Sequence, residues 1–178
     1  MTKAADRLLA LVRNVPDFPE PGILFRDLTP MLADPAGLSL AIEMLAAAAL
    51  AGPPPDLIAG LEARGFLFGV ALAERLGTGF VPLRKAGKLP PPVHAVDYQL
   101  EYGTARLELA CGTVPTGARV LLVDDLLATG GTAIAGARLL REAGAEVEQA
   151  LFVIALEQLG GRAALAAEGL ASTALLDC

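Results

Sequence analysis

Apolar residues recur along the chain at two different spacings. Over residues 4–14 and 36–51 they recur every three or four positions, which predicts helices. Short continuous apolar runs, bounded by glycine, proline or charge, are typical of strands buried in a parallel sheet. These runs are Leu57–Gly60, Gly79–Leu83, Val120–Val123 and Gln149–Ala155. Further helices are predicted at 66–76 and 132–143, so the alternation indicates an α/β fold with a mainly parallel central sheet flanked by helices.

One stretch interrupts this alternation. Residues 84–96 contain three consecutive prolines and two lysines, which predicts a mobile loop that carries His94 as an exposed residue. After it, Tyr98–Glu101 and Ala105–Leu109 flank a turn that contains glycine. This pattern predicts a hairpin or two short strands that reach away from the core.

Composition narrows the class of protein. At 178 residues the chain fits one domain, and a net charge of −6 counts against binding to a nucleic acid backbone. No apolar run reaches the ~20 residues of a membrane span, and the N-terminal segment lacks the uninterrupted apolar core of a signal peptide. Cys111 and Cys178 lie far apart without metal-ligand spacing, which predicts free thiols. We therefore expect a soluble cytoplasmic protein without a membrane partner or a protein metal site.

Positive charge is concentrated at one place. Arg84, Lys85 and Lys88 fall within five residues of one another in an otherwise acidic chain. Such a cluster indicates either a local anion site or a solvated loop. The charge pattern alone leaves both interpretations open.

The segment from Val120 to Thr132 carries the strongest chemical pattern. An apolar strand brings Asp124 and Asp125 to its carboxyl end, where ligands of open α/β sheets bind. Adjacent carboxylates need donors or a cation to offset desolvation, and ribose hydroxyls with a Mg²⁺-bound substrate would supply both. Residues 128–132 then bring backbone N–H groups to a helix N-terminus, which favours a phosphate. The simpler alternative is an acidic helix cap followed by a glycine-rich turn.

This segment closely resembles the phosphoribosyl-pyrophosphate signature of type I phosphoribosyltransferases. Both have an apolar strand, two acidic residues and a loop ending Thr-Gly-Gly-Thr, and the Gly-Lys-Ser/Thr ending of a P-loop is absent. Further segments resemble adenine phosphoribosyltransferases in the same order along the chain. They are Phe25–Asp27, Gly60–Gly69, Val81–Pro90 and Tyr98–Gly103. The resemblance covers roughly residues 5–160.

The resemblance implies a type I phosphoribosyltransferase fold in a single domain over residues 1–178. A small N-terminal hood would occupy about 1–35 and a flexible catalytic loop about 84–102. The implied reaction joins adenine to phosphoribosyl pyrophosphate and gives AMP and pyrophosphate in purine salvage. Mg²⁺ would be held mainly by substrate oxygens and water. A homodimer is expected, because in the family the residue matching Arg84 can come from the neighbouring subunit.

The same resemblance assigns binding residues. Ribose and its 5′-phosphate would be bound by Asp124, Asp125, Ala128, Thr129, Gly130, Gly131 and Thr132. Pyrophosphate would be bound by Glu62, Ala63, Arg64, Arg84, Lys88 and Tyr102, with a cis peptide bond joining the first two. The base would be bound by Leu24, Phe25, Arg26 and Leu126.

Three residues are expected to act in catalysis: Glu101, Arg64 and Lys88. Glu101 resembles the family's proposed acid/base near the purine, with a cross-strand ion pair as the alternative. Arg64 would stabilise charge on the leaving group, or else form a surface salt bridge. Lys88 would act through loop closure, which excludes water from the reaction. Tyr102 would contact substrate or pack in the hairpin.

Three other functions fit parts of this pattern. A phosphoribosyltransferase for guanine, xanthine or a pyrimidine would use the same sugar site. A catalytically silent sensor could bind phosphoribosyl pyrophosphate and control a partner, although the acidic charge and the lack of a DNA-binding module oppose this. A ribose-phosphate pyrophosphokinase shares part of the signature, but such chains are longer and have a separate ATP-binding half.

Overall fold

The computed structural model describes residues 3–100 and 103–178, and the chain forms two compact units. The first unit is Met1–Met44 and the second is Leu45–Cys178. The predicted boundary of a hood near residue 35 stays a prediction.

The first unit contains helix α1 (Lys3–Leu9), strands β1 (Arg13–Pro16) and β2 (Leu24–Asp27), helix α2 (Thr29–Ala33) and most of helix α3 (Pro35–Ala49). β1 and β2 pair antiparallel, and Arg13 Nε donates to Asp27 Oδ2 at 3.0 Å across the ladder. The predicted helix over 4–14 is therefore wrong in its second half. Helical periodicity continues past Leu9, but the backbone of residues 13–16 pairs with β2 instead. One segment's own pattern cannot reveal that partner.

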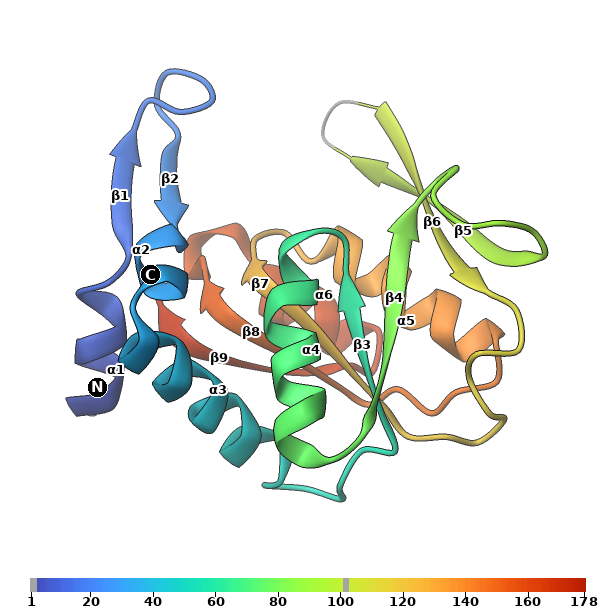
Figure 1. The fold of residues 1–178 in the computed structure, drawn as a ribbon. Coiled ribbons are helices and arrows are strands. Elements are labelled where there is room, and N and C mark those ends of the chain that lie inside the picture. Colours follow the sequence, from blue (N-terminus) through green and yellow to red (C-terminus); the bar gives the residue numbers. More distant parts are fainter. Residues whose placement is uncertain (1–2, 101–102) are drawn as a thin grey trace. The chain divides into compact units, whose positions relative to one another are not determined.

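A seven-stranded sheet forms the second unit, in the order β5-β6-β4-β3-β7-β8-β9. Its strands are β3 (Leu57–Leu61), β4 (Gly79–Lys85), β5 (Val93–Leu100), β6 (Gly103–Ala110), β7 (Val120–Leu127), β8 (Gln149–Ala155) and β9 (Ala171–Asp177). The five strands from β4 to β9 in this order run parallel, whereas β5 and β6 form an antiparallel hairpin on the β4 edge. This mainly parallel α/β arrangement confirms the predicted fold class (Figure 1).

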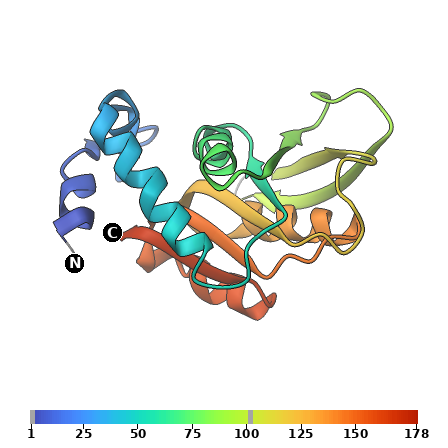
Figure 2. The same ribbon diagram turned by 60° about the horizontal axis from the view of Figure 1, so that its bottom comes forward.

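Helices cover both faces of this sheet. α4 (Arg64–Leu76) lies on one face, and α5 (Gly131–Glu142) and α6 (Gly161–Ala167) lie on the other (Figure 2). A short 3-10 helix, η1 (Glu157–Leu159), precedes α6. Within the part of the chain that the structure describes, no helix is long and apolar enough to cross a membrane.

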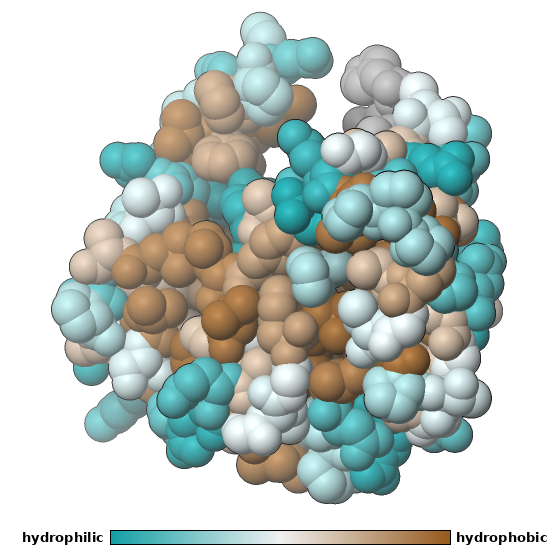
Figure 3. Space-filling view, turned by 45° about the vertical axis from the view of Figure 1, so that its right-hand side comes forward, coloured by the Kyte–Doolittle hydropathy of each residue, from teal (hydrophilic) through white to brown (hydrophobic). Residues whose placement is uncertain are grey.

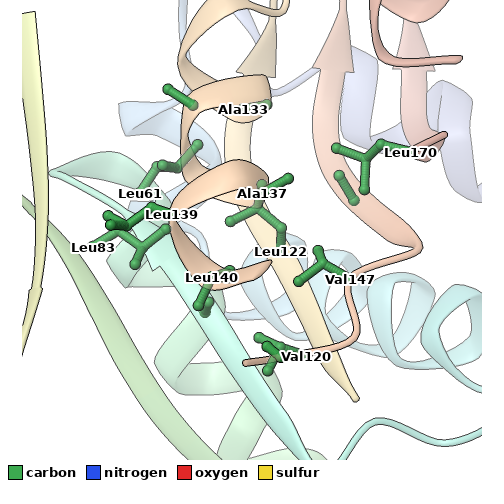
Figure 4. Packing of buried hydrophobic residues seen from close by; sticks show 14 of the residues in the cluster. Leu61, Leu83, Val120, Leu122, Ala133, Ala137, Leu139, Leu140, Val147 and Leu170 are labelled. Carbon is green, nitrogen blue, oxygen red and sulfur yellow. The ribbon is translucent and has the colours of Figure 1, made fainter. Parts of the chain in front are cut away.

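The largest hydrophobic core lies between α5 and the central strands. Leu61, Leu83 and Leu122 are fully buried side chains of β3, β4 and β7, and they pack with Leu139 and Leu140 of α5 (Figure 4). At Gly136 in the same helix, an added methyl group would lie 3.0 Å from Leu61 Cδ2 and 3.1 Å from Leu83 Cδ1. The absence of a side chain there lets α5 approach the sheet closely.

The predicted loop over 84–96 is wrong at both ends, because residues 84–85 and 93–96 belong to strands. β4 continues to Lys85 and pairs with β6, while β5 begins at Val93 and pairs with β6 over its whole length. Only the turn 86–92 separates them, so the described part of the predicted flexible loop 84–102 is mostly strand. The three prolines fall in this turn and before β5, where the sheet needs no N–H donor from them. His94, predicted to be exposed in a loop, is a half-buried residue of β5.

Truncating the core is expected to destabilise the protein strongly. Leu122→Ala leaves a cavity between β7 and α5, at a cost of about 2–5 kcal/mol in the free energy of unfolding. Leu50→Ala is the matched control, because that side chain is 56% exposed and its loss should change the free energy by no more than about 0.5 kcal/mol. Chemical denaturation of both variants measures the difference. Equal stability of the two variants would contradict this description of the core.

Candidate active site

The carboxyl ends of three neighbouring parallel strands carry the charged residues of the candidate site. β4, β3 and β7 lie side by side in parallel register, so their carboxyl ends meet at one edge of the sheet. Glu62 follows β3 directly, Arg84 is near the end of β4, and Asp124 and Asp125 lie in the last half of β7. The structure therefore brings together residues that are up to 63 positions apart in sequence, at the edge where such folds bind ligands.

Asp125 is the most buried charged group at this edge. Its side chain is 5% exposed, and Arg64 Nε, from the first residue of α4, lies 2.7 Å from Asp125 Oδ2. Asp124 is half-buried, and its Oδ1 accepts the backbone N–H of Asp125 at 2.9 Å. Burial raises the pKa of both carboxyls above the ordinary value of 3.8. The charge of Asp125 raises the pKa of Asp124 further, whereas the charge of Arg64 limits the rise at Asp125.

Glu62 forms a second ion pair, with Arg84. Arg84 Nε lies 3.1 Å from Glu62 Oε2, and the same oxygen accepts the backbone N–H of Lys85 at 2.7 Å. Burial would raise the pKa of Glu62, but the hydrogen bonds from Arg84 and Lys85 and the charges of Arg84 and Lys88 lower it below 4.5. The Arg84 guanidinium also lies 5.8 Å from the centre of the Phe66 ring, a distance typical of a cation–π contact. The peptide bond joining Glu62 and Ala63 is cis, which confirms that prediction.

A hollow suited to a phosphate lies between β7 and α5. It has a volume of about 330 Å³, including its open mouth, and is lined by Asp124, residues 126–133 and Phe152. Gly130, with φ of 88°, is the N-terminal cap of α5, and its carbonyl oxygen accepts the N–H of Ile134 at 2.9 Å. Free N–H groups of the first helical turn and the positive end of the helix dipole favour an anion at this place. The hydroxyl-bearing residue Thr129 is exposed.

Several of the predicted site residues are not joined to this group by the structure. Leu24, Phe25 and Arg26 belong to the first unit, so their position relative to the sheet edge is not described. Lys88 lies exposed in the turn 86–92. Glu101 and Tyr102 lie outside the described residues.

Sequence reasoning missed one buried carboxylate beside the site. Glu108 of β6 is 9% exposed, and its Oε2 accepts the backbone N–H of Gly87 at 3.0 Å. Gly87 has φ of 76°, a conformation that suits glycine, and it directly precedes Lys88. Glu108 therefore fixes the base of the turn that carries this lysine. The available signal was a single acidic residue between Leu107 and Leu109 in a strand with two buried leucines.

Comparison with known proteins decides the family. A model of the phosphoribosyl transferase domain matches residues 31–167, which is most of the chain. The chain belongs to the phosphoribosyltransferase family. An adenine phosphoribosyltransferase of Sphingopyxis alaskensis is 57% identical over 95% of this chain and 91% of the relative. One of Mycobacteroides abscessus is 58% identical over 91% of this chain and 90% of the relative.

Solved structures of phosphoribosyltransferases share the fold over almost the whole chain. The adenine phosphoribosyltransferase of Thermoanaerobacter pseudethanolicus has a TM-score of 0.92 and 48% identity, covering 98% of this chain and 99% of that one. The enzyme of Saccharomyces cerevisiae, solved with adenine and an imino-altritol bisphosphate, has a TM-score of 0.91 and 38% identity over 99% of this chain and 100% of that one. These likenesses confirm the predicted type I phosphoribosyltransferase fold.

Replacing one of the adjacent carboxylates by an amide is expected to stabilise the folded protein. In wild type the folded-state pKa of Asp124 lies above its unfolded value of 3.8, so the folded state binds more protons and stability falls as pH rises through that interval. Asp124→Asn removes this loss. Its unfolding midpoint should be higher than that of wild type at pH 7, by about 2–4 °C for each kcal/mol regained.

Thermal unfolding between pH 4 and pH 8 measures this effect. Asp97→Asn is the matched control, because that carboxylate is exposed and 3.6 Å from Arg106, and it should leave the midpoint almost unchanged. A variant Asp124→Asn that melts below wild type at pH 7 would show that the charge is compensated in the folded state.

Proposed function

We propose that this chain transfers the 5-phosphoribosyl group of phosphoribosyl pyrophosphate to adenine, giving AMP and pyrophosphate in purine salvage. The observation that carries the proposal is the pair Asp124 and Asp125 directly before a phosphate-sized hollow at the N-terminus of α5. Relatives 55–58% identical over most of the chain carry the name adenine phosphoribosyltransferase. The reaction class is thus a pentosyl transfer.

The sugar phosphate would be held by β7 and the loop after it. Backbone N–H groups of residues 128–131 and the hydroxyls of Thr129 and Thr132 would donate to the 5′-phosphate. Asp124 and Asp125 would accept hydrogen bonds from ribose hydroxyls. Because both carboxylates are held in place before substrate arrives, they would orient the anomeric carbon without further rearrangement of β7.

The leaving pyrophosphate would be stabilised by Arg64, Arg84 and Lys88. In the structure Arg64 pairs with Asp125 and Arg84 with Glu62, so both guanidinium groups are already held at the sheet edge by acidic partners. A phosphate oxygen can share such a guanidinium, because the planar group offers five N–H donors. The peptide at Ala63 would contribute a backbone donor. As positive charge develops at the anomeric carbon, donors aimed at the leaving group lower the barrier.

Other residues would recognise the base and transfer the proton. Phe25 offers an aromatic face and meets Phe18 edge-on at 5.2 Å within the first unit, and Leu126 offers an apolar face. Backbone groups of Leu24 and Arg26 would read the edge of adenine. Glu101 would manage the proton as N9 attacks, and Tyr102 would contact substrate.

We also propose Mg²⁺ as part of the substrate complex and a cytoplasmic location. Mg²⁺ would neutralise charge on the pyrophosphate and would keep substrate oxygens and water as most of its ligands. The acidic side chains at the end of β7 supply carboxylate oxygens, which could accept hydrogen bonds from water bound to Mg²⁺. Free thiols at Cys111 and Cys178 support a reducing compartment.

The direct test offers several bases to the purified protein together with phosphoribosyl pyrophosphate. Adenine, guanine, hypoxanthine, xanthine, uracil and orotate are supplied separately, with and without Mg²⁺, to wild type and Glu101→Ala. We expect Mg²⁺-dependent AMP and pyrophosphate formation with adenine alone, reduced about 10²–10⁴-fold in the variant if the carboxylate acts as acid/base. Turnover with another base would keep the sugar site and reject the base assignment. Binding of phosphoribosyl pyrophosphate without turnover would indicate the silent sensor.

We further propose that the chain acts as a homodimer. Leu67 and Val70, one turn apart on α4, are each 51% exposed and give this helix an apolar outer face. Figure 3 shows hydrophobic residues gathered over the middle of one face of the molecule, with hydrophilic residues above and below them. A symmetric pair would cover such a surface, and paired dimers are the commonest homo-oligomers.

Light scattering after size-exclusion chromatography tests the dimer. Wild type should elute with twice the chain mass of 18.3 kDa, and Val70→Glu should shift the protein towards the monomer. Leu50→Glu is the matched control, since Leu50 is similarly exposed at 56% but lies outside α4. A monomeric wild type would reject the homodimer, and an unchanged Val70→Glu dimer would reject this surface.

A further inference from the structure

The loop 128–130, here called the phosphate loop, contacts the N-terminus of α6, a segment to which the sequence alone assigns no role. The loop 128–130 joins β7 to α5, and two glycines of the chain face each other where it meets α6. A methyl group added at Gly161 would overlap the carbonyl oxygen of Ala128 and would lie 2.9 Å from Leu127 Cδ1. Backbone of the loop and backbone of α6 therefore touch with no room for a side chain.

The contact is reciprocal. A methyl group added at Gly130 would lie 2.5 Å from Leu165 Cδ1 and 3.2 Å from the carbonyl oxygen of Gly161. Leu165 is fully buried, so it cannot move aside into solvent. The loop is also held from its other end, because the N–H of Leu156 donates to the carbonyl oxygen of Leu127 at 2.8 Å. These contacts restrict the position of the Ala128 carbonyl and the orientation of the peptide group that it shares with Thr129.

A single arginine fixes α6 in turn. Arg162, next to Gly161, donates from Nε to Glu157 Oε1 at 2.6 Å and from Nη1 to the carbonyl oxygen of Ser172 at 3.2 Å, and it also pairs with Asp177. These partners come from η1 and β9, so the N-terminus of α6 is tied to the edge of the sheet on two sides. The start of α6 is therefore held by side-chain contacts to two neighbouring elements.

We propose that Gly161 is a positioning residue for the 5′-phosphate, acting through the carbonyl of Ala128 and held in place by Arg162. This inference rests on the proposed function. The amide N–H of Thr129 belongs to the same planar peptide group as that carbonyl, so displacing the oxygen turns the N–H away from the phosphate. We expect the effect to be confined to ligands that carry a 5′-phosphate, because Gly161 contacts the end of β7 and the loop after it, whereas Arg64 and Arg84 belong to α4 and β4.

Isothermal titration of AMP, ribose 5-phosphate and adenine into wild type and Gly161→Ala tests the proposal. We expect the dissociation constants of AMP and ribose 5-phosphate to rise about tenfold or more, which is about 1.4 kcal/mol, and that of adenine to change less than about twofold. Gly79→Ala is the matched control. There an added methyl group would lie 2.8 Å from Leu57 Cδ2 at the opposite end of β4, so it crowds a side chain without touching the loop.

A second pair of variants keeps the test decisive if Gly161→Ala fails to fold. Arg162→Ala should weaken ribose 5-phosphate binding in the same selective way, and Arg162→Lys should recover part of it, because one ammonium can replace some of the lost hydrogen bonds. Equal losses for adenine and for the phosphate ligands, or no loss in either variant, would overturn the role of Gly161. If wild type itself binds neither AMP nor ribose 5-phosphate, the proposed function fails instead.

Discussion

The ion pair between Arg64 and the buried carboxylate of Asp125 is the constraint on which the site depends. A carboxylate that is 5% exposed costs much free energy unless a cation and hydrogen bonds compensate it, and Arg64 supplies that cation at 2.7 Å. The pair also fixes geometry, because Arg64 begins α4 and Asp125 lies near the end of β7. The turn after β3, the start of one helix and the end of the central strand are thereby held together at the edge where ligand would bind.

Two ion pairs lie at this edge, Arg64 with Asp125 and Arg84 with Glu62. Their carboxylates have pKa values shifted in opposite directions. Glu62 accepts hydrogen bonds from the side chain of Arg84 and from the backbone N–H of Lys85, so its pKa falls and it stays ionised beside Arg84. The pKa values of Asp124 and Asp125 rise, because burial outweighs the effect of one guanidinium at both carboxyls and the charge of Asp125 adds to the rise at Asp124. Negative charge is therefore poorly compensated at Asp124 and Asp125, where hydroxyl donors of a sugar would bind. It is well compensated at Glu62, where a pyrophosphate would compete for Arg84. Sugar hydroxyls that donate to Asp124 and Asp125 would compensate these two carboxylates directly.

The parts of the fold that sequence could predict are those that depend on short-range pattern. β8 was predicted at its observed ends, Gln149–Ala155, and the helix after Gly130 within one residue, because a continuous apolar run and a glycine cap each act locally. The strand β1 and the extension of β4 to Lys85 were missed, since both depend on pairing with distant strands. Glu108 was missed for a related reason, because it accepts a hydrogen bond from the N–H of Gly87, a partner 21 positions away.

Closeness of backbone to backbone is the hardest of these properties to read from a sequence. Gly130 was identified because it stands in a recognisable Thr-Gly-Gly-Thr loop, whereas Gly161 stands in an ordinary Gly-Gly-Arg turn with no chemical group of its own. Gly161 contributes by having no side chain, which leaves room for the Ala128 carbonyl beside it. Only the structure shows this close approach. A binding loop built from main-chain donors needs such a support, because a flexible loop would lose conformational entropy each time it bound an anion. The start of α6 can therefore be understood as the support of a phosphate loop whose own residues all lie before it in the sequence.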